Sequence, residues 1–197
     1  MTHCAALEQV LQCCQIMGIR YTVLHPTGQR ADLSIIEDAQ EFLDVNIRVM
    51  RPILELAEKY QVVILSENLC WGGTIPLKNI SDLVDAVHSP WFGWCCDTGH
   101  IHGFGTGIRE LEHVSCVPQM LHIQDNNGDN RDDHMIPFDG SIDWYECMRI
   151  LKKMDYQGEF TLEAHHKCRE LPDEMRDSHL TELLMRSRKL AAYYDGL

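Results

Sequence analysis

The chain has 197 residues, of which 45% are hydrophobic and 24% charged, the balance of an ordinary globular protein, and its formal net charge is -13. A surplus of acidic residues repels phosphate backbones and anionic membranes, so we expect neither nucleic acid nor a membrane as the partner, although a local basic patch can exist on an acidic protein.

The cysteines and the absence of long apolar runs indicate the class of protein and its compartment. The nine cysteines are odd in number, include two adjacent pairs and form no CxxC spacing, so neither a disulfide framework nor a zinc knuckle is expected. We expect reduced, mostly buried thiols in a cytoplasmic protein. The N-terminus lacks the pattern of a signal peptide, and no apolar stretch reaches the roughly 20 residues of a membrane helix.

Helical and strand-like segments alternate along the chain. Helical spacing of apolar residues predicts helices over 7–17, 43–57, 80–88, 107–115, 144–154 and 178–194. Short apolar runs predict strands over 21–25, 62–67, 92–97, 120–125 and 159–164. Pro52 predicts a kink or a break in the second helical region. Because such alternation favours parallel strands joined by right-handed crossovers, and no linker interrupts it, we expect one α/β domain over 1–197.

Each predicted strand ends in polar chemistry. The residues concerned are His25, Glu67, Asp97, His122 and Glu163. The carboxyl ends of parallel strands lie on one face, so these side chains are expected to converge. Carboxylates and at least one imidazole would form a shell for a divalent cation, whereas several buried carboxylates without a cation would repel one another.

Each of these residues also has a plain structural interpretation. Asp97 alone would usually be a turn former or a helix N-cap. A single strand-end glutamate is more often a solvated or ion-paired residue, and a lone histidine such as His122 is more often packed than a ligand. The recurrence of polar residues at every strand end favours the metal interpretation.

The segments around the strand ends contain further candidates. Asp132 and His134 form an Asp-x-His pair in the Gly- and Asn-rich loop over 125–144, which would offer two ligands to one ion; the alternative is a flexible acidic loop. His100 follows Asp97 by three residues. His165 and His166 follow Glu163 closely enough to support its position.

The segment after the second predicted strand, NLCWGG, is less specific. Trp71 would be either a wall of a substrate pocket or a packed indole. Gly72 and Gly73 would allow the backbone to approach a ligand.

Four segments together resemble the xylose isomerase-like TIM-barrel superfamily, which includes sugar phosphate isomerases and epimerases, ketose 3-epimerases and endonuclease IV-type enzymes. They are LSENL (65–69), CDTGH (96–100), LHIQDNNGDNRDDHMIPFDGSIDW (121–144) and YQGEFTLE (156–163). The resemblance covers nearly the whole chain and implies a (β/α) barrel. A full barrel typically takes about 250 residues. The match begins at the family's fourth strand, so we expect an incomplete barrel of about five βα units in which the N-terminal three are missing.

The resemblance also implies roles for individual residues. Glu67, Asp97, His122 and Glu163 match the shared metal shell, and Glu67 and Glu163 match the two carboxylates that move the proton in the epimerases.

Further roles follow from the same resemblance. His100 matches a substrate-binding histidine of the epimerases, and we assign His25 and Trp71 to the substrate as well. In the endonuclease branch His100, Asp132 and His134 match ligands of an additional metal, and His25 matches a ligand of the first metal.

The expected function is therefore a divalent-metal-dependent sugar or sugar phosphate isomerase or epimerase. Mn²⁺ or Mg²⁺ suits the oxygen-rich shell best, with Zn²⁺ and Co²⁺ as alternatives. The competing functions are a zinc-dependent endonuclease acting on abasic DNA and a partial barrel that binds metal without turnover. Because an incomplete barrel exposes sheet edges, we expect either a fragment or a homo-oligomer in which a second copy covers the open edge.

Overall fold

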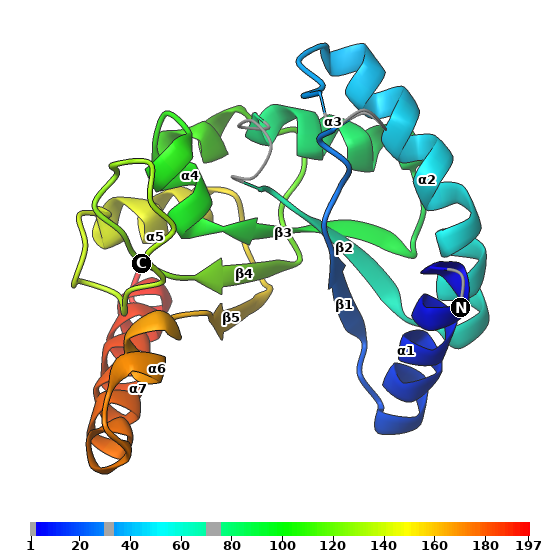
Figure 1. Cartoon of the computed structure of the whole chain (residues 1–197). Coiled ribbons are helices and arrows are strands. Elements are labelled where there is room, and N and C mark those ends of the chain that lie inside the picture. The colour runs from blue at the N-terminus through cyan, green and yellow to red at the C-terminus, as the bar shows by residue number, and fades with distance from the viewer. Residues whose placement is uncertain (1–2, 30–33, 70–75) are drawn as a thin grey trace. The chain divides into compact units, whose positions relative to one another are not determined.

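The computed structural model describes residues 3–29, 34–69 and 76–197. Helices and strands alternate throughout (Figure 1). The elements in chain order are α1 (His3–Met17), β1 (Tyr21–Leu24), α2 (Ala39–Tyr60), β2 (Val63–Glu67), α3 (Leu77–Val87), β3 (Phe92–Asp97), α4 (Thr98–Phe104), the 3-10 helix η1 (Ile108–His113), β4 (Met120–Ile123), α5 (Trp144–Lys153), β5 (Glu159–Leu162), α6 (His166–Glu170) and α7 (Asp173–Asp195).

The five strands form one sheet in the order β1-β2-β3-β4-β5. The β1–β2, β2–β3 and β4–β5 pairs are parallel, with Tyr21 opposite Val63 and Met120 opposite Glu159. Each strand is one of those predicted, and together with the alternating helices they confirm the α/β class. The chain forms two compact units, Met1–Cys95 and Cys96–Leu197, called here the N-terminal and C-terminal units.

In the N-terminal unit, α1 and α2 lie beside β1 and β2 (Figure 1). Helix α2 begins at Ala39, after its N-cap Asp38, whose carboxylate accepts a hydrogen bond from the Glu41 amide at 2.8 Å. It continues through Pro52 to Tyr60, so the predicted break does not occur. The buried face of the helix, which includes Phe42 and Met50, provides packing that offsets the hydrogen bond lost at the proline.

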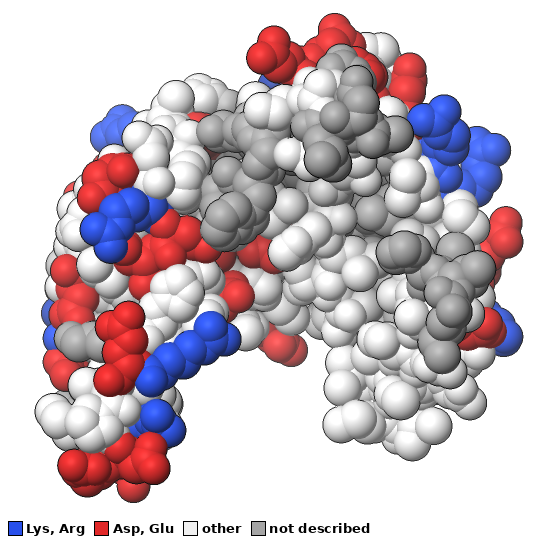
Figure 2. Space-filling view, viewed as in Figure 1, with Lys and Arg blue, Asp and Glu red and all other residues white. Residues whose placement is uncertain are grey.

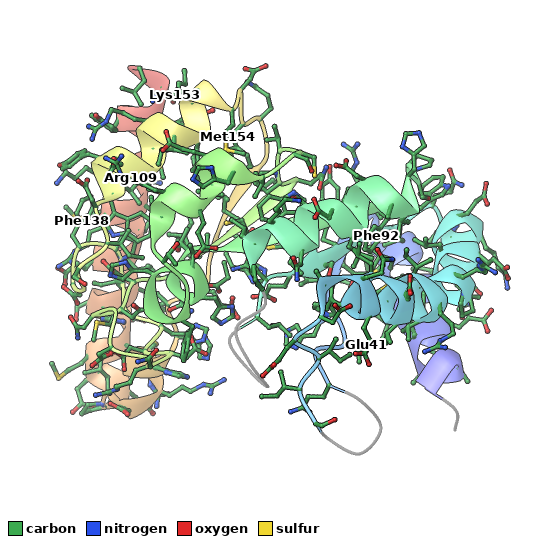
Figure 3. All side chains as sticks on the ribbon, turned by 90° about the horizontal axis from the view of Figure 1, so that it is seen from above. Glu41, Phe92, Arg109, Phe138, Lys153 and Met154 are labelled. Atoms are coloured by element: carbon green, nitrogen blue, oxygen red, sulfur yellow. The ribbon has the colours of Figure 1, made fainter. Side chains whose placement is uncertain are left out.

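In the C-terminal unit, α5 packs against α7 and η1. Asp143 caps α5 by accepting from the Glu146 amide at 2.9 Å, and Trp144 and Cys147 are among the residues that the helix buries. Arg109 of η1 lies beside α5 (Figure 3), and its Nη2 is 2.5 Å from Glu146 Oε1. These contacts secure α5, the helix that follows the loop after β4.

Several details differ from the sequence expectation. The helix predicted over 107–115 is the short 3-10 helix η1, and α4 and α6 were not predicted because each is too short to show an apolar period. The seven cysteines that the structure describes are free thiols, four of them buried. None of the helices within 3–29, 34–69 and 76–197 has the length and hydropathy needed to cross a bilayer.

Candidate metal centre

Three predicted metal ligands meet at the carboxyl ends of strands in the C-terminal unit. Asp97 is the last residue of β3, His122 lies on β4, and Glu163 directly follows β5. Each offers one ligand atom, and these atoms lie within 4.8 Å of one another. His122 Nδ1 is 2.7 Å from Glu163 Oε2. The side chain of Asp97 is fully buried, and that of Glu163 is 34% exposed, so a ligand could reach the centre from the glutamate side.

Asp97 has the capping role that its position suggests, and its role as a metal ligand stays a prediction. Its Oδ1 accepts a hydrogen bond from the His100 amide at 2.8 Å, and Asp97 is the N-cap of α4. A carboxylate has lone pairs for several partners, so this capping bond leaves acceptor capacity for a cation. The capping bond holds the carboxylate in one orientation.

Glu67 and His25 lie together in the N-terminal unit. Glu67 ends β2 with its side chain only 5% exposed, and its Oε2 is 3.4 Å from Nε2 of the exposed His25. The predicted catalytic glutamate is therefore a buried carboxylate paired with the histidine that we assigned to the substrate.

The three residues of the predicted additional metal site are neighbours in the C-terminal unit. Asp132 Oδ1 is 3.5 Å from His100 Nε2, and Asp132 Oδ2 is 3.1 Å from His134 Nε2. Burial alone would raise the pKa of Asp132, but hydrogen bonds from His100, His134 and Gln124 outweigh it and hold the pKa well below its ordinary value. Asp132 is thus a persistent anion between two imidazoles.

Gln124 links these groups and was not predicted as a site residue. Its Nε2 donates to Asp132 Oδ1 at 2.8 Å and lies 3.4 Å from Asp97 Oδ2, while its Oε1 accepts from the His134 amide at 3.2 Å. A Cβ added to Gly99 would lie 2.3 Å from the Gln124 side chain, so Gly99 provides the space. The sequence did contain a signal for Gln124. It lies two residues after His122, and residues at i and i+2 of a strand point to the same face of the sheet.

Asp125 is a second unpredicted residue, and its role is structural. The carboxylate is fully buried and accepts hydrogen bonds from the amides of Asn126, Phe138 and Ile142 and from Trp144 Nε1 at 2.8 Å. These four bonds fold the loop over 125–144 back onto the end of β4. A buried carboxylate therefore organises this loop.

The surface around this loop is acidic. Figure 2 shows acidic side chains gathered over the loop between β4 and α5, with a few basic side chains beside them. Among the acidic groups, Asp133 Oδ1 pairs with Arg131 at 2.8 Å and Asp139 Oδ1 with Arg186 at 2.7 Å.

Trp71, Gly72 and Gly73 lie outside the described residues. Their predicted parts in the substrate pocket stay predictions.

The donors in the C-terminal unit fit a divalent cation. Two carboxylates and one imidazole, with Asp97 fully buried, match the oxygen and nitrogen preferences of Mn²⁺, Mg²⁺, Zn²⁺ and Co²⁺.

Comparison of the chain with known proteins shows its family. Residues 3–184 match the family described as xylose isomerase-like TIM barrel. An uncharacterised protein of Methanocaldococcus jannaschii is 28% identical over 129 residues, which cover 62% of this chain and 44% of that protein. One of Sinorhizobium fredii is 28% identical over 126 residues, covering 64% of this chain and 38% of that protein. The chain therefore spans less than half the length of these relatives.

Solved structures show the same fold. A zinc-bound IolI protein has a TM-score of 0.72 at 19% identity, covering 96% of this chain and 68% of that chain. A D-psicose 3-epimerase crystallised in the presence of D-fructose has a TM-score of 0.73 at 14% identity, covering 95% and 70%. A D-tagatose 3-epimerase-like protein has a TM-score of 0.67 at 20% identity, covering 94% and 70%. At such identities the likeness establishes the fold alone, and it confirms an incomplete TIM barrel with five strands. The chain belongs to the xylose isomerase-like TIM barrel family.

Proposed function

We propose that the chain is a divalent-metal-dependent sugar or sugar phosphate isomerase or epimerase that moves a proton between carboxylates. The observation that carries the proposal is the meeting of Asp97, His122 and Glu163, whose ligand atoms lie within 4.8 Å of one another. The fold neighbours named as sugar epimerases and the zinc-bound neighbour support it. We propose Glu67, the buried carboxylate at the end of β2, as the fourth ligand.

The proposed chemistry needs a weakly acidic C–H bond next to a carbonyl. The cation, when bound, acts as a Lewis acid on the substrate carbonyl and the neighbouring hydroxyl and so makes that C–H bond more acidic. Glu163 or Glu67 then removes the proton from the carbinol carbon. In an epimerisation the other carboxylate returns a proton to the opposite face of the same carbon, so the product has the composition of the substrate and the inverted configuration.

In the proposed mechanism, His122 positions the side chain of Glu163. Its contact with Glu163 fixes the side chain that has to face the substrate, and a displacement of about 1 Å in such groups can cost about 100-fold in rate. We propose His100, which lies between Asp97 and Asp132, and the exposed His25 as the groups that bind the sugar hydroxyls.

Exchange of substrate hydrogen with solvent tests the mechanism directly. The full chain loaded with Mn²⁺ is incubated with a panel of ketohexoses and their phosphates in D₂O, and deuterium next to the carbonyl is measured by NMR. We expect incorporation with the wild type and a loss of at least about 100-fold for Glu163→Gln, since general acid–base catalysis contributes on this scale. Glu159→Gln is the matched control because Glu159 is exposed at the start of the same strand.

Two outcomes would reject the proposal. Near-wild-type exchange by Glu163→Gln would remove Glu163 from the proton transfer. A wild type that binds the cation but exchanges no hydrogen on any sugar would favour the partial barrel without turnover.

The endonuclease alternative has one specific observation in its favour, the contacts of Asp132 with both His100 and His134. The net charge of -13 weighs against a nucleic-acid substrate. Three zinc ions per chain, together with cleavage of DNA containing an abasic site, would favour this alternative over the sugar enzyme.

We also propose a cytoplasmic homo-oligomer in which a second copy covers an open edge of the sheet. The edge strands are β1 and β5, and apolar side chains of α1 are exposed, with Ile16 at 76% and Met17 at 72%. Sedimentation of the full chain tests the assembly, and a monomer at micromolar concentration would contradict it.

A further inference from the structure

Three imidazoles meet beside the candidate metal centre in the C-terminal unit. His134 comes from the loop between β4 and α5, His165 lies between β5 and α6, and His166 is the first residue of α6. The ring centroid of His134 is 4.4 Å from that of His165 and 4.6 Å from that of His166, and the latter two are 4.7 Å apart. Each histidine offers one ligand nitrogen, and these nitrogens lie within 4.8 Å of one another.

Contacts on both sides hold His134 in place. Its Nδ1 donates to the carbonyl oxygen of Glu163 at 2.6 Å, and its amide donates to Gln124 Oε1 at 3.2 Å. The residue has a φ of 45°, a left-handed conformation that costs energy for a residue with a side chain and requires such support. A histidine that binds a metal usually donates its other ring N–H to a carbonyl or a carboxylate, and the Glu163 carbonyl is such a partner.

The carboxylate beside His134 Nε2 favours a proton or a cation at that nitrogen. When Nδ1 carries the donated hydrogen, Nε2 of a neutral ring has a lone pair, yet it lies 3.1 Å from the carboxylate oxygen Oδ2 of Asp132. Two acceptors at this distance repel each other unless a proton or a cation lies at Nε2.

Two further imidazoles lie beside His134 and offer ligand nitrogens of their own. The ring of His134 is 4.4 Å from that of His165 and 4.6 Å from that of His166. A proton on His134 would satisfy only Asp132, whereas a metal ion would use one nitrogen from each of the three rings.

We propose that His134, His165 and His166 bind a second divalent cation, of the zinc class, that is separate from the ion at Asp97, His122 and Glu163. Three imidazoles favour Zn²⁺ over Mg²⁺ or Mn²⁺, which prefer oxygen ligands. Ligand nitrogens lie roughly 3.4 Å apart in a tetrahedral zinc shell, so small rotations of the three rings would close the site. The ion would tie the first turn of α6 to the loop.

The site has room for a further ligand. His165 and His166 are only half-buried, and His166 lines a pocket of about 590 Å³ together with Arg131, Asp133, Met135, Asp139 and Glu170. A tetrahedral ion with three protein ligands keeps its fourth position for water or for a small molecule that enters from this pocket.

Metal titration tests the inference without any assay of turnover. The full chain is stripped of metal and saturated with Mn²⁺ to fill the oxygen-rich centre, and Zn²⁺ is then added while its binding is measured by calorimetry. Because Zn²⁺ can displace Mn²⁺ from such a centre, the manganese released during the titration is counted by electron paramagnetic resonance and an equal amount is subtracted from the bound zinc. Co²⁺ in a parallel titration reports the geometry through its visible spectrum, which is more intense for a four-coordinate site. We expect one zinc-class ion per wild-type chain beyond the manganese.

Four variants assign that ion to its ligands. His165→Gln combined with His166→Gln should remove the additional zinc and the four-coordinate cobalt spectrum. His113→Gln, a change of an exposed histidine, should retain both, and so should His100→Gln. Asp132→Asn should weaken zinc binding, because it removes a negative charge that lies 3.1 Å from His134 Nε2, the nitrogen that would hold the ion.

The result that would overturn the inference is an additional zinc that survives the double change of His165 and His166. If that zinc were instead lost with His100→Gln, the ion would lie at His100, Asp132 and His134. His122→Gln separates the two proposals, because it should reduce Mn²⁺ binding and leave the zinc-class ion in place. The circular dichroism spectrum of each variant shows whether a loss of binding reflects unfolding.

Discussion

His122 and Glu163 approach each other from neighbouring strands, with Nδ1 and Oε2 2.7 Å apart. His122 lies opposite Thr161 in the parallel β4–β5 register, and Glu163 follows two residues later. The contact therefore depends on strand pairing in addition to the position of each residue in its own segment. It brings two predicted ligands together at one end of the sheet.

Metal should stabilise the folded chain through this contact. A ligand that binds only the folded state raises the free energy of unfolding by about 2.7 kcal/mol at 100 times its dissociation constant. We expect Mn²⁺ to raise the melting temperature of the wild type, and EDTA to reverse the rise. The rise should be largely absent in His122→Gln and intact in His113→Gln, as measured by differential scanning calorimetry. An equal rise in His122→Gln would place the manganese elsewhere.

Gly99→Ala should disturb the centre through Gln124. The added methyl would lie 2.3 Å from the Gln124 side chain and displace its amide from Asp132 and Asp97. We expect a loss of about 1–3 kcal/mol in the free energy of unfolding, the usual cost of overpacking, and weaker binding of Mn²⁺. In urea unfolding, Gly196→Ala is the control, since its methyl would meet no atom closer than 3.4 Å. Unchanged stability and metal affinity in Gly99→Ala would show that Gln124 has no positioning part.

Asp125→Asn should destabilise the loop between β4 and α5. An asparagine presents one oxygen instead of two, and its amide group would face N–H donors that now find a carboxylate. Since hydrogen bonds to a charged group contribute about 1.5–3 kcal/mol each, we expect a loss of about 3 kcal/mol in total in the free energy of unfolding after partial rearrangement. Unfolding can be followed by the fluorescence of the buried Trp144. The exposed Asp129→Asn is the control, and equal stability of the two variants would contradict the structural role of Asp125.

Cys147 should be unreactive in the folded protein. Burial and, to a smaller extent, the charge of Asp143 together raise the pKa of its thiol from an ordinary value of 9.0 to about 12. Below pH 9 the thiol is protonated in both the folded and the unfolded state. Between about pH 9 and 12 the unfolded chain releases this proton first, so the group lowers the stability of the fold as the pH rises.

Alkylation at pH 8 with identification of the labelled peptides checks this expectation. The exposed Cys13 should react in the native protein, and Cys147 should react only after unfolding in urea. Equal labelling of both thiols under native conditions would show that the core around Cys147 opens readily.

The amino-acid sequence was enough to locate the five strands and the polar residues at their ends. Both follow from local patterns: an apolar run has a strand-like length, and parallel pairing places every carboxyl end on one face. For this reason Asp97, His122 and Glu163 could be predicted as neighbours in the C-terminal unit. Their carboxylate and imidazole groups were also enough to suggest a divalent cation.

Other parts of the candidate site arise only from the tertiary structure. His134 meets His165 and His166 because a buried carboxylate, Asp125, folds the intervening loop back, and no periodic pattern of hydrophobic residues encodes the path of a loop. The position of the Gln124 side chain likewise depends on the space left by Gly99, which lies 25 residues earlier in the chain. Such a contact results from packing between segments. Local sequence specifies which chemical groups are present at the strand ends, whereas their distances depend on long-range packing and on loops ordered by buried hydrogen bonds.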